Sequence, residues 1–301
     1  MILERLKEVP PIEDDKQVRL KESGNIIEIM SSNTRSKGGY ITKLSSEIFV
    51  DNRTGEVKEF KHNVNRASDL QNVAKSLAMG RDMLNANIKD VSKCRWVTLT
   101  YSLNMTDPKK LLFDFKNFNK QCRAKYGHYE YITAAEPQGR GAWHLHCVLI
   151  FESKAPYMDN KTVSDLWKQG FVTIKKLDNV DNVGAYLTAY LGDMELTEAR
   201  SQGIQGGEQK TVDYEENGEK KSKSYIKGAR LYMYPVGFHI FRWSKGCQKP
   251  IVSECTYKEA KEKACDGTQT FSKAVTIRDE ESDFTNTLVY EYYNRIRVKN
   301  Q

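Results

Sequence analysis

The sequence predicts an α+β fold in which helices cover an antiparallel sheet. Alternating apolar and polar residues mark short strands, and apolar residues at helical spacing mark the helices between them. From about residue 95 the two patterns follow one another in the order β-α-β-β-α-β-α. Two of the strands are joined by a short Pro/Gly turn, which is typical of a β-hairpin.

The composition is compatible with a polyanionic partner. With 301 residues the chain can bury a sizeable core in one large domain or in two. Its 47 Lys and Arg residues exceed its 40 Asp and Glu residues, which gives a net charge of +7. This excess suits nucleic acid, although a solvated surface with spare lysines would give the same total.

The same survey indicates a cytoplasmic protein. The 6 cysteines include no C-x-x-C pair and are expected to be reduced thiols. The charged N-terminus has no apolar run that would make a signal peptide, and no stretch is apolar enough to span a membrane. A phosphate-binding G-x-x-x-x-G-K-[ST] loop is absent from the sequence, so helicase work is expected from another protein.

We divide the chain into four segments. Residues 1–64 are predicted as an N-terminal arm and hairpin, residues 65–200 as the core that carries the chemistry, and residues 201–229 as a flexible charged loop. Residues 230–301 are expected to form C-terminal strands that complete the core or bind DNA.

The first elements follow from local patterns. Residues 1–40 are polar without a persistent period and predict an extended arm, whereas strand-like runs flank DNRTG in residues 40–60. Asn65 is a candidate N-cap for a helix that extends to about Ile88.

The next strand and helix have clearer boundaries. RWVTLTY, from Arg95, alternates as a strand should. Asp107 and Pro108 then supply a helix N-cap and first residue, and Gly127 ends that helix.

The run YEYITAAEPQGRGAWHLHCVLIF, residues 129–151, is the predicted hairpin. His144 and His146 are two apart, so both imidazoles leave the same face of the second strand. A turn centred near Gly139 and Arg140 would set Glu136 beside His144. Two nitrogens and one oxygen would then converge on one point and could share a metal ion, although a pair of satisfied core histidines would give the same pattern.

A short helix around residues 164–168 and a strand from Phe171 follow the hairpin. The next segment, VDNVGAYLTAYLGDMEL, has helical spacing, and its Tyr186 and Tyr190 are four apart. Their hydroxyl groups would therefore lie one turn apart on one helix face. Without a metal motif before them, they would indicate a half-buried aromatic pair.

These motifs, in this order, resemble the HUH endonucleases, and specifically the two-tyrosine rolling-circle replication initiators of phages and plasmids. The resemblance rests on TLTY at residues 98–101, on Glu136 with HLH at residues 144–146, and on the Tyr186 and Tyr190 pair. It implies an RRM-like antiparallel sheet covered by helices, with additions at both ends. It also implies a divalent metal, Mg²⁺ or Mn²⁺, on Glu136, His144 and His146.

The activity implied by the resemblance is the nicking and later rejoining of one DNA strand. Tyr186 or Tyr190 would attack a phosphodiester, giving a 5′-phosphotyrosine and a free 3′-OH. The expected partners are single-stranded or hairpin origin DNA, a host or separate helicase, and a DNA polymerase. Family members often carry lysine just before the second tyrosine, where this chain has Ala189.

Beyond residue 229, RLYMYPVGFHIFRWSKGCQKP mixes aromatic and cationic residues. We identify Arg230, Arg242, Trp243 and Lys245 as candidate contacts to single-stranded DNA, because aromatic faces stack on bases while cations bind phosphates. Two ordinary strands with aromatic interiors would have a similar composition.

Three other functions fit parts of this pattern. A conjugative relaxase shares the chemistry, but its tyrosine usually precedes the histidine motif. A single-strand DNA transposase of the same superfamily keeps the order found here. A non-catalytic DNA-binding protein, in which the His, Glu and Tyr residues are structural, is favoured by Ala189.

Overall fold

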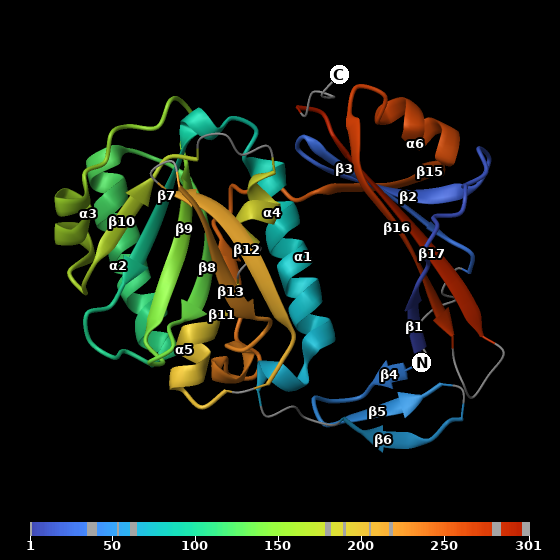
Figure 1. The fold of residues 1–301 in the computed structure, drawn as a ribbon, viewed down its shortest axis with the longest axis horizontal. Coiled ribbons are helices and arrows are strands. Elements are labelled where there is room, and N and C mark those ends of the chain that lie inside the picture. Colours follow the sequence, from blue (N-terminus) through green and yellow to red (C-terminus); the bar gives the residue numbers. More distant parts are fainter. Residues whose placement is uncertain are drawn as a thin grey trace. The chain divides into compact units, whose positions relative to one another are not determined.

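The computed structural model has two compact units, which we describe separately (Figure 1). The central unit comprises residues 64–250, and the terminal unit combines residues 1–63 with residues 251–301. The structure describes residues 2–34, 41–52, 54–60, 65–177, 182–188, 191–204, 206–216, 219–278 and 284–296; within these, it leaves out the side chains of residues 183, 186, 187, 212–216 and 219–221.

The central unit is built on a five-stranded antiparallel sheet, and it confirms the predicted α+β class. The strand order is β10-β7-β9-β8-β14. The strands are β7 (Cys94–Thr100), β8 (Glu130–Pro137), β9 (Trp143–Ile150), β10 (Val172–Lys175) and β14 (Phe241–Trp243). The central strands β7 and β9 carry the buried residues Val97, Leu99, Leu145 and Cys147 of the main core.

Two helices connect the strands of this sheet. Helix α2 (Pro108–Tyr126) begins as predicted, with the Asp107 side chain accepting from Lys109 N, and it ends at Gly127. Helix α3 (Asn160–Trp167) follows β9. The rings of Phe118 and Trp167 meet edge to face at 6.0 Å, which joins the two helices in the main core.

The predicted helix after Asn65 is divided in two. Asn65 caps a short 3₁₀ turn, η1 (Arg66–Ser68), and helix α1 (Leu70–Asn87) begins only after Asp69, whose extended φ of −129° interrupts the helix. At Gly80 the helix passes close to β14, because an added Cβ there would lie 2.5 Å from the Phe241 ring.

The structure differs from the predicted flexible loop at residues 201–229. Strands β12 (Gln209–Glu216) and β13 (Glu219–Ile226) pair along their whole length, and β11 (Met194–Glu195) joins β13. A small apolar cluster of Met194, Ala199 and Ile226 anchors this sheet. The segment therefore needs few apolar residues to be ordered, since the backbone pairing is continuous.

The predicted N-terminal arm is also a set of strands. The terminal unit has a six-stranded antiparallel sheet of order β1-β16-β17-β3-β2-β15. Its strands are β1 (Ile2–Arg5), β2 (Gln17–Ser23), β3 (Ile26–Ser32), β15 (Ile251–Thr256), β16 (Thr268–Arg278) and β17 (Thr285–Asn294). The arm is ordered because its strands pair with β15, β16 and β17 from the other end of the chain.

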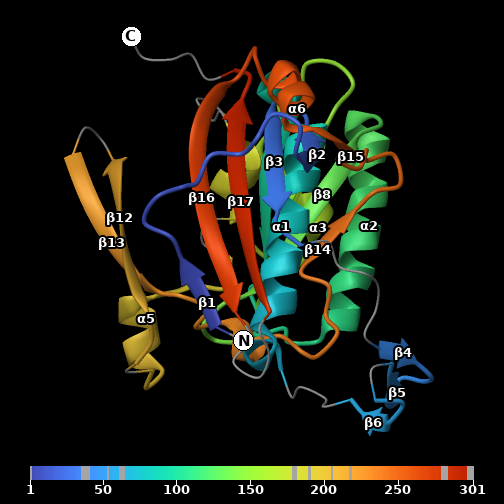
Figure 2. The same cartoon turned by 90° about the vertical axis from the view of Figure 1, so that its right-hand side faces the viewer.

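Helix α6 (Tyr257–Lys263) covers one face of this sheet (Figure 2). Its Ala260 packs with Leu20, Ile27 and Ile29, and a capping box between Thr256 and Glu259 fixes its start. The predicted pairing of the last two strands is confirmed, although its turn at residues 279–283 lies outside the described residues.

The remaining elements are short. The hairpin predicted around DNRTG is confirmed as β5 (Ile48–Asp51) and β6 (Val57–Glu59), with β4 (Ile41–Lys43) added at the edge. The other helical turns are η2 (Val91–Lys93), α4 (Val183–Thr188), α5 (Leu196–Ser201) and η3 (Leu231–Met233). Across the described residues, no helix is long and apolar enough to cross a membrane.

Candidate metal centre

The hairpin of β8 and β9 brings Glu136, His144 and His146 together, as predicted from their spacing. Glu136 is the direct cross-strand partner of His144. His146 lies two residues further along β9 and therefore shares the face of His144. The register is set by a tight turn in which Gln138 N donates to Ala142 O.

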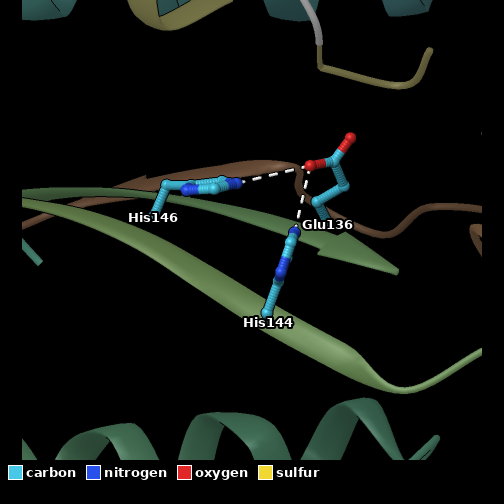
Figure 3. A group of neighbouring side chains, drawn as sticks. All are labelled: Glu136, His144 and His146. Carbon is cyan, nitrogen blue, oxygen red and sulfur yellow. Dashed lines mark hydrogen bonds and ion pairs between the residues drawn. The ribbon is translucent and has the colours of Figure 1, made fainter. Parts of the chain in front are cut away.

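The three side chains converge on one carboxylate oxygen (Figure 3). Glu136 Oε2 lies 3.0 Å from His144 Nε2 and 3.3 Å from His146 Nε2. The three ligand-type atoms all lie within 4.8 Å of one another. Within the described part of the chain, this is the one group of three or more such side chains with that spacing.

Burial and charge hold these groups in the protonation states that bind metal. Burial alone would raise the pKa of the Glu136 carboxyl, but the hydrogen bonds from His144 and His146 and the charge of Arg230 outweigh it, and they hold that pKa well below its ordinary value. Burial lowers the pKa of His144, and its hydrogen bond to Glu136 offsets this only in part. An ionised carboxylate and a neutral imidazole are the forms that coordinate a cation.

Two neighbours that the sequence did not predict for this site hold the second oxygen of Glu136. Arg230 Nη1 lies 3.0 Å from Glu136 Oε1, and the backbone N–H of Gly192 donates to the same oxygen at 3.2 Å. Arg230 also donates to Glu198 Oε2 at 2.6 Å. The carboxylate is therefore fixed from behind, while its Oε2 faces the two imidazoles.

His146 has a further contact through its other ring nitrogen. Thr98 Oγ1, on β7, lies 3.3 Å from His146 Nδ1, as the cross-strand pairing of these two residues requires. A hydroxyl in this position can fix the ring orientation and the tautomer. Thr98 belongs to the TLTY segment, so this motif contributes a side chain to the site.

The donor set fits a divalent cation. Two imidazoles and one carboxylate leave coordination positions for substrate and water. Carboxylate oxygen suits Mg²⁺ and Mn²⁺, and imidazole also accepts Zn²⁺ and Ni²⁺, so the set is compatible with a divalent metal without selecting one.

Comparison with known proteins points to DNA replication. Residues 94–195 match the model of a family described as replication-associated protein ORF2. The match covers about a third of the chain and supports a replication initiator role. Comparison with curated proteins and with solved structures gave no match.

The segment similar to this family begins at β7, contains the whole metal centre, and ends just after the predicted tyrosine helix. Tyr186 lies in α4, but its side chain is not described, and Tyr190 and Ala189 lie outside the described residues. The roles of both tyrosines therefore stay predictions.

The start of α4 is well anchored. Asn85, buried on α1, accepts from Gly184 N at 2.8 Å and donates to Asn182 Oδ1 at 3.1 Å. Beyond the helix, the contact of Gly192 with Glu136 brings the chain to the metal centre. The two anchors lie on either side of the tyrosine pair in the sequence.

The four candidate DNA contacts lie in different surroundings. Arg230 is part of the metal centre, where two carboxylates bind its guanidinium group. Arg242 lies over the Phe238 ring at 6.0 Å. Trp243 is 36 % exposed and lines a hollow of about 380 Å³, and Lys245 is exposed. DNA binding by these residues stays a prediction.

Most of the neighbouring aromatic residues are core residues. Tyr234, Phe238 and Phe241 are buried, and the Trp143 and Phe238 rings stack at 4.6 Å. Aromatic composition alone could not separate these residues from the exposed Trp243, since the chain forms only a short strand there and otherwise turns.

Proposed function

We propose that this protein is a rolling-circle replication initiator that nicks one DNA strand at an origin and later rejoins it. The observation that carries the proposal is the convergence of Glu136, His144 and His146 within the segment that is similar to replication-associated proteins. The family similarity supports replication, and the ligand-type group supports metal-assisted chemistry on DNA phosphates.

The connectivity of the central sheet supports an HUH endonuclease fold. Strands β7, β8, β9 and β10 with helices α2 and α3 make two interleaved β-α-β units. In chain order these strands are numbered one to four, and their order across the sheet is 4-1-3-2. This is the split β-α-β arrangement of ferredoxin-like and RRM-like sheets.

Glu136, His144 and His146 would hold Mg²⁺ or Mn²⁺. When bound there, the cation would neutralise a non-bridging phosphate oxygen and orient the scissile bond. Arg230 and Gly192 would keep the Glu136 carboxylate ionised and in place, and Thr98 would orient the His146 ring.

Tyr186 or Tyr190 would be the nucleophile. The phenol oxygen attacks phosphorus and loses its proton, the bond from phosphorus to the 3′ oxygen breaks, and that oxygen gains a proton. The products are a 5′-phosphotyrosine, which conserves the phosphodiester energy for rejoining, and a free 3′-OH that a polymerase can extend. The contacts of Asn85 and Gly192 would keep this part of the chain beside the metal centre.

A covalent-adduct assay tests the proposal. Single-stranded origin DNA labelled on the 3′ side of the cut should become bound to the protein in Mn²⁺ and not in EDTA. The double variant Tyr186→Phe with Tyr190→Phe should form no adduct. Tyr157→Phe is the matched control, because Tyr157 is 85 % exposed and belongs to neither motif.

Three results would contradict the proposal. Wild-type protein that binds DNA but never forms an adduct would favour a non-catalytic DNA-binding protein. An adduct in the double variant would place the nucleophile on another residue. Cleavage restricted to transposon ends, with none on the protein's own replicon, would favour a single-strand transposase.

A further inference from the structure

The terminal sheet has a second face, opposite the one that α6 covers, and this face carries aromatic and cationic side chains. Cross-strand register places Tyr290 beside Lys273 and beside Met30, and places Tyr292 beside Phe271. We call this surface the aromatic face. It comprises the following side chains from five strands: Arg5, Arg19, Lys21, Glu28, Met30, Phe271, Lys273, Tyr290 and Tyr292.

The aromatic rings of this face lie in a row, with cations above them. The centroids of the Phe271 and Tyr292 rings are 6.0 Å apart. Lys273 Nζ lies 5.0 Å from the centre of the Tyr290 ring, and Arg5 lies 5.7 Å from that of Phe271. Phe271 is 46 % exposed, although a large apolar ring of this kind is ordinarily buried.

The charge of this face is positive. At the registered positions of the described strands, four cations, Arg5, Arg19, Lys21 and Lys273, stand against two carboxylates, Glu28 and Glu254, which leaves a net charge of +2. Lys21 pairs with Glu28 at 3.0 Å. The cations over the rings at the β16 side therefore make most of the excess.

A hollow lies on the same face next to the aromatic row. Its volume is about 320 Å³, and its lining includes Gln17, Arg19, Met30 and Ser32. Met30 pairs with both Arg19 and Tyr290, so the hollow continues the row of rings toward β2. Polar groups in a concave site can contact the edge of an unpaired base.

We propose that the aromatic face binds single-stranded DNA. Bases would stack on Phe271, Tyr290 and Tyr292, while Arg5 and Lys273 would contact phosphates. Base faces are accessible only when the strand is unpaired, and sheets that bind single strands combine aromatic platforms with cations in this way. The site lies in the terminal unit and uses neither the metal ligands nor the tyrosines Tyr186 and Tyr190.

Such a face would give the protein a second hold on the DNA. A strand cut at the central unit has to be retained until it is rejoined, and an additional binding site on the same chain raises its local concentration. This consequence rests on the proposed function, whereas binding by the aromatic face does not.

The test measures DNA binding without any cleavage. Fluorescent oligothymidylate of about 20 nucleotides, a length that exceeds the site of a single binding fold, is titrated with the full-length protein in EDTA. The double variant Phe271→Leu with Tyr292→Leu should bind about 5- to 100-fold more weakly, the loss expected for one stacked base or more. Tyr290→Phe, which keeps the ring, should bind as the wild type does.

A salt titration tests the cations. Single-strand binding loses about 0.7 in the slope of log affinity against log salt for each phosphate contact removed. Arg5→Ser and Lys273→Ser should therefore each lower the slope by about this amount. Tyr157→Leu, an exposed aromatic residue of the central unit, is the matched control and should change neither affinity nor slope.

Two results would overturn the proposal. Unchanged affinity in a double variant that unfolds in urea as the wild type does would show that the rings only stabilise the sheet. Tighter binding of oligouridylate through the same face would overturn the assignment to DNA. If the double variant does not fold, photocrosslinking of bromodeoxyuridine DNA to the wild type decides instead: crosslinks on residues 271–292 support the site, and crosslinks confined to the central unit refute it.

Discussion

The packing of α4 on α1 can be tested by a single added methyl group at Gly184. A Cβ at this position would lie 2.4 Å from the backbone oxygen of Arg81 and 2.8 Å from Asn85 Oδ1. The first of these atoms is backbone and cannot rotate away. In Gly184→Ala, helix α4 would have to move away from α1 and would lose the hydrogen bond from Gly184 N to Asn85.

The opposing energies can be compared. Overpacking costs about 1–3 kcal/mol, and the lost hydrogen bond adds about 1 kcal/mol. The higher helix propensity of alanine offsets up to about 1 kcal/mol. We therefore expect Gly184→Ala to lower the free energy of unfolding by about 1–3 kcal/mol. Adduct formation should slow as well, because the displaced helix carries Tyr186.

Urea unfolding measures the first effect, and single-turnover adduct formation measures the second. Gly206→Ala is the control, since nothing lies within 4 Å of a Cβ built at Gly206. If Gly184→Ala is as stable as the wild type, α4 does not approach α1 this closely, and the argument for how the tyrosine segment is anchored is wrong.

Three further predictions concern the metal centre and the tyrosines. Thr98→Val should weaken Mn²⁺ binding by about 10- to 100-fold in calorimetry, because it removes the partner of His146 Nδ1; equal affinity would show that the hydroxyl does not orient the ring. Since burial lowers the pKa of His144 below 6.5, the unfolded chain binds a proton that the folded chain refuses. The unfolding free energy of the metal-free protein should therefore fall as pH drops from about 7 to 5, and this fall should be smaller in His144→Gln. Tyr186→Phe should slow the first cleavage by several orders of magnitude, against about 10- to 100-fold for Tyr190→Phe, with mass spectrometry locating the nucleotide on the remaining tyrosine; the reverse order would assign the first attack to Tyr190.

The metal centre could be predicted from sequence because it is local. Two residues two apart on one strand must share a face, and a tight turn fixes which residue of the first strand faces them. The ion pair of Arg230 with Glu136 could not be found in this way, because the two residues are distant in the chain and no periodicity relates them. Arg230 was identified as a DNA contact from composition alone.

The terminal sheet was missed for a similar reason. Helix boundaries at Asp107 and Gly127 depend on neighbouring residues and were predicted closely. The pairing of β3 with β17 depends on residues at opposite ends of the chain. The alternation of exposed and buried residues in β2, with Val18 and Leu20 buried, was nevertheless a usable strand signal within the predicted arm.

The order in which the terminal sheet is assembled also affects synthesis of the protein. Strands β1, β2 and β3 leave the ribosome first, but their partners β15, β16 and β17 follow only after the whole central unit has been made. The central unit can thus fold during translation, while the first three strands wait with unpaired edges. Stalled synthesis or loss of the last strands would leave those edges exposed to pairing with other chains.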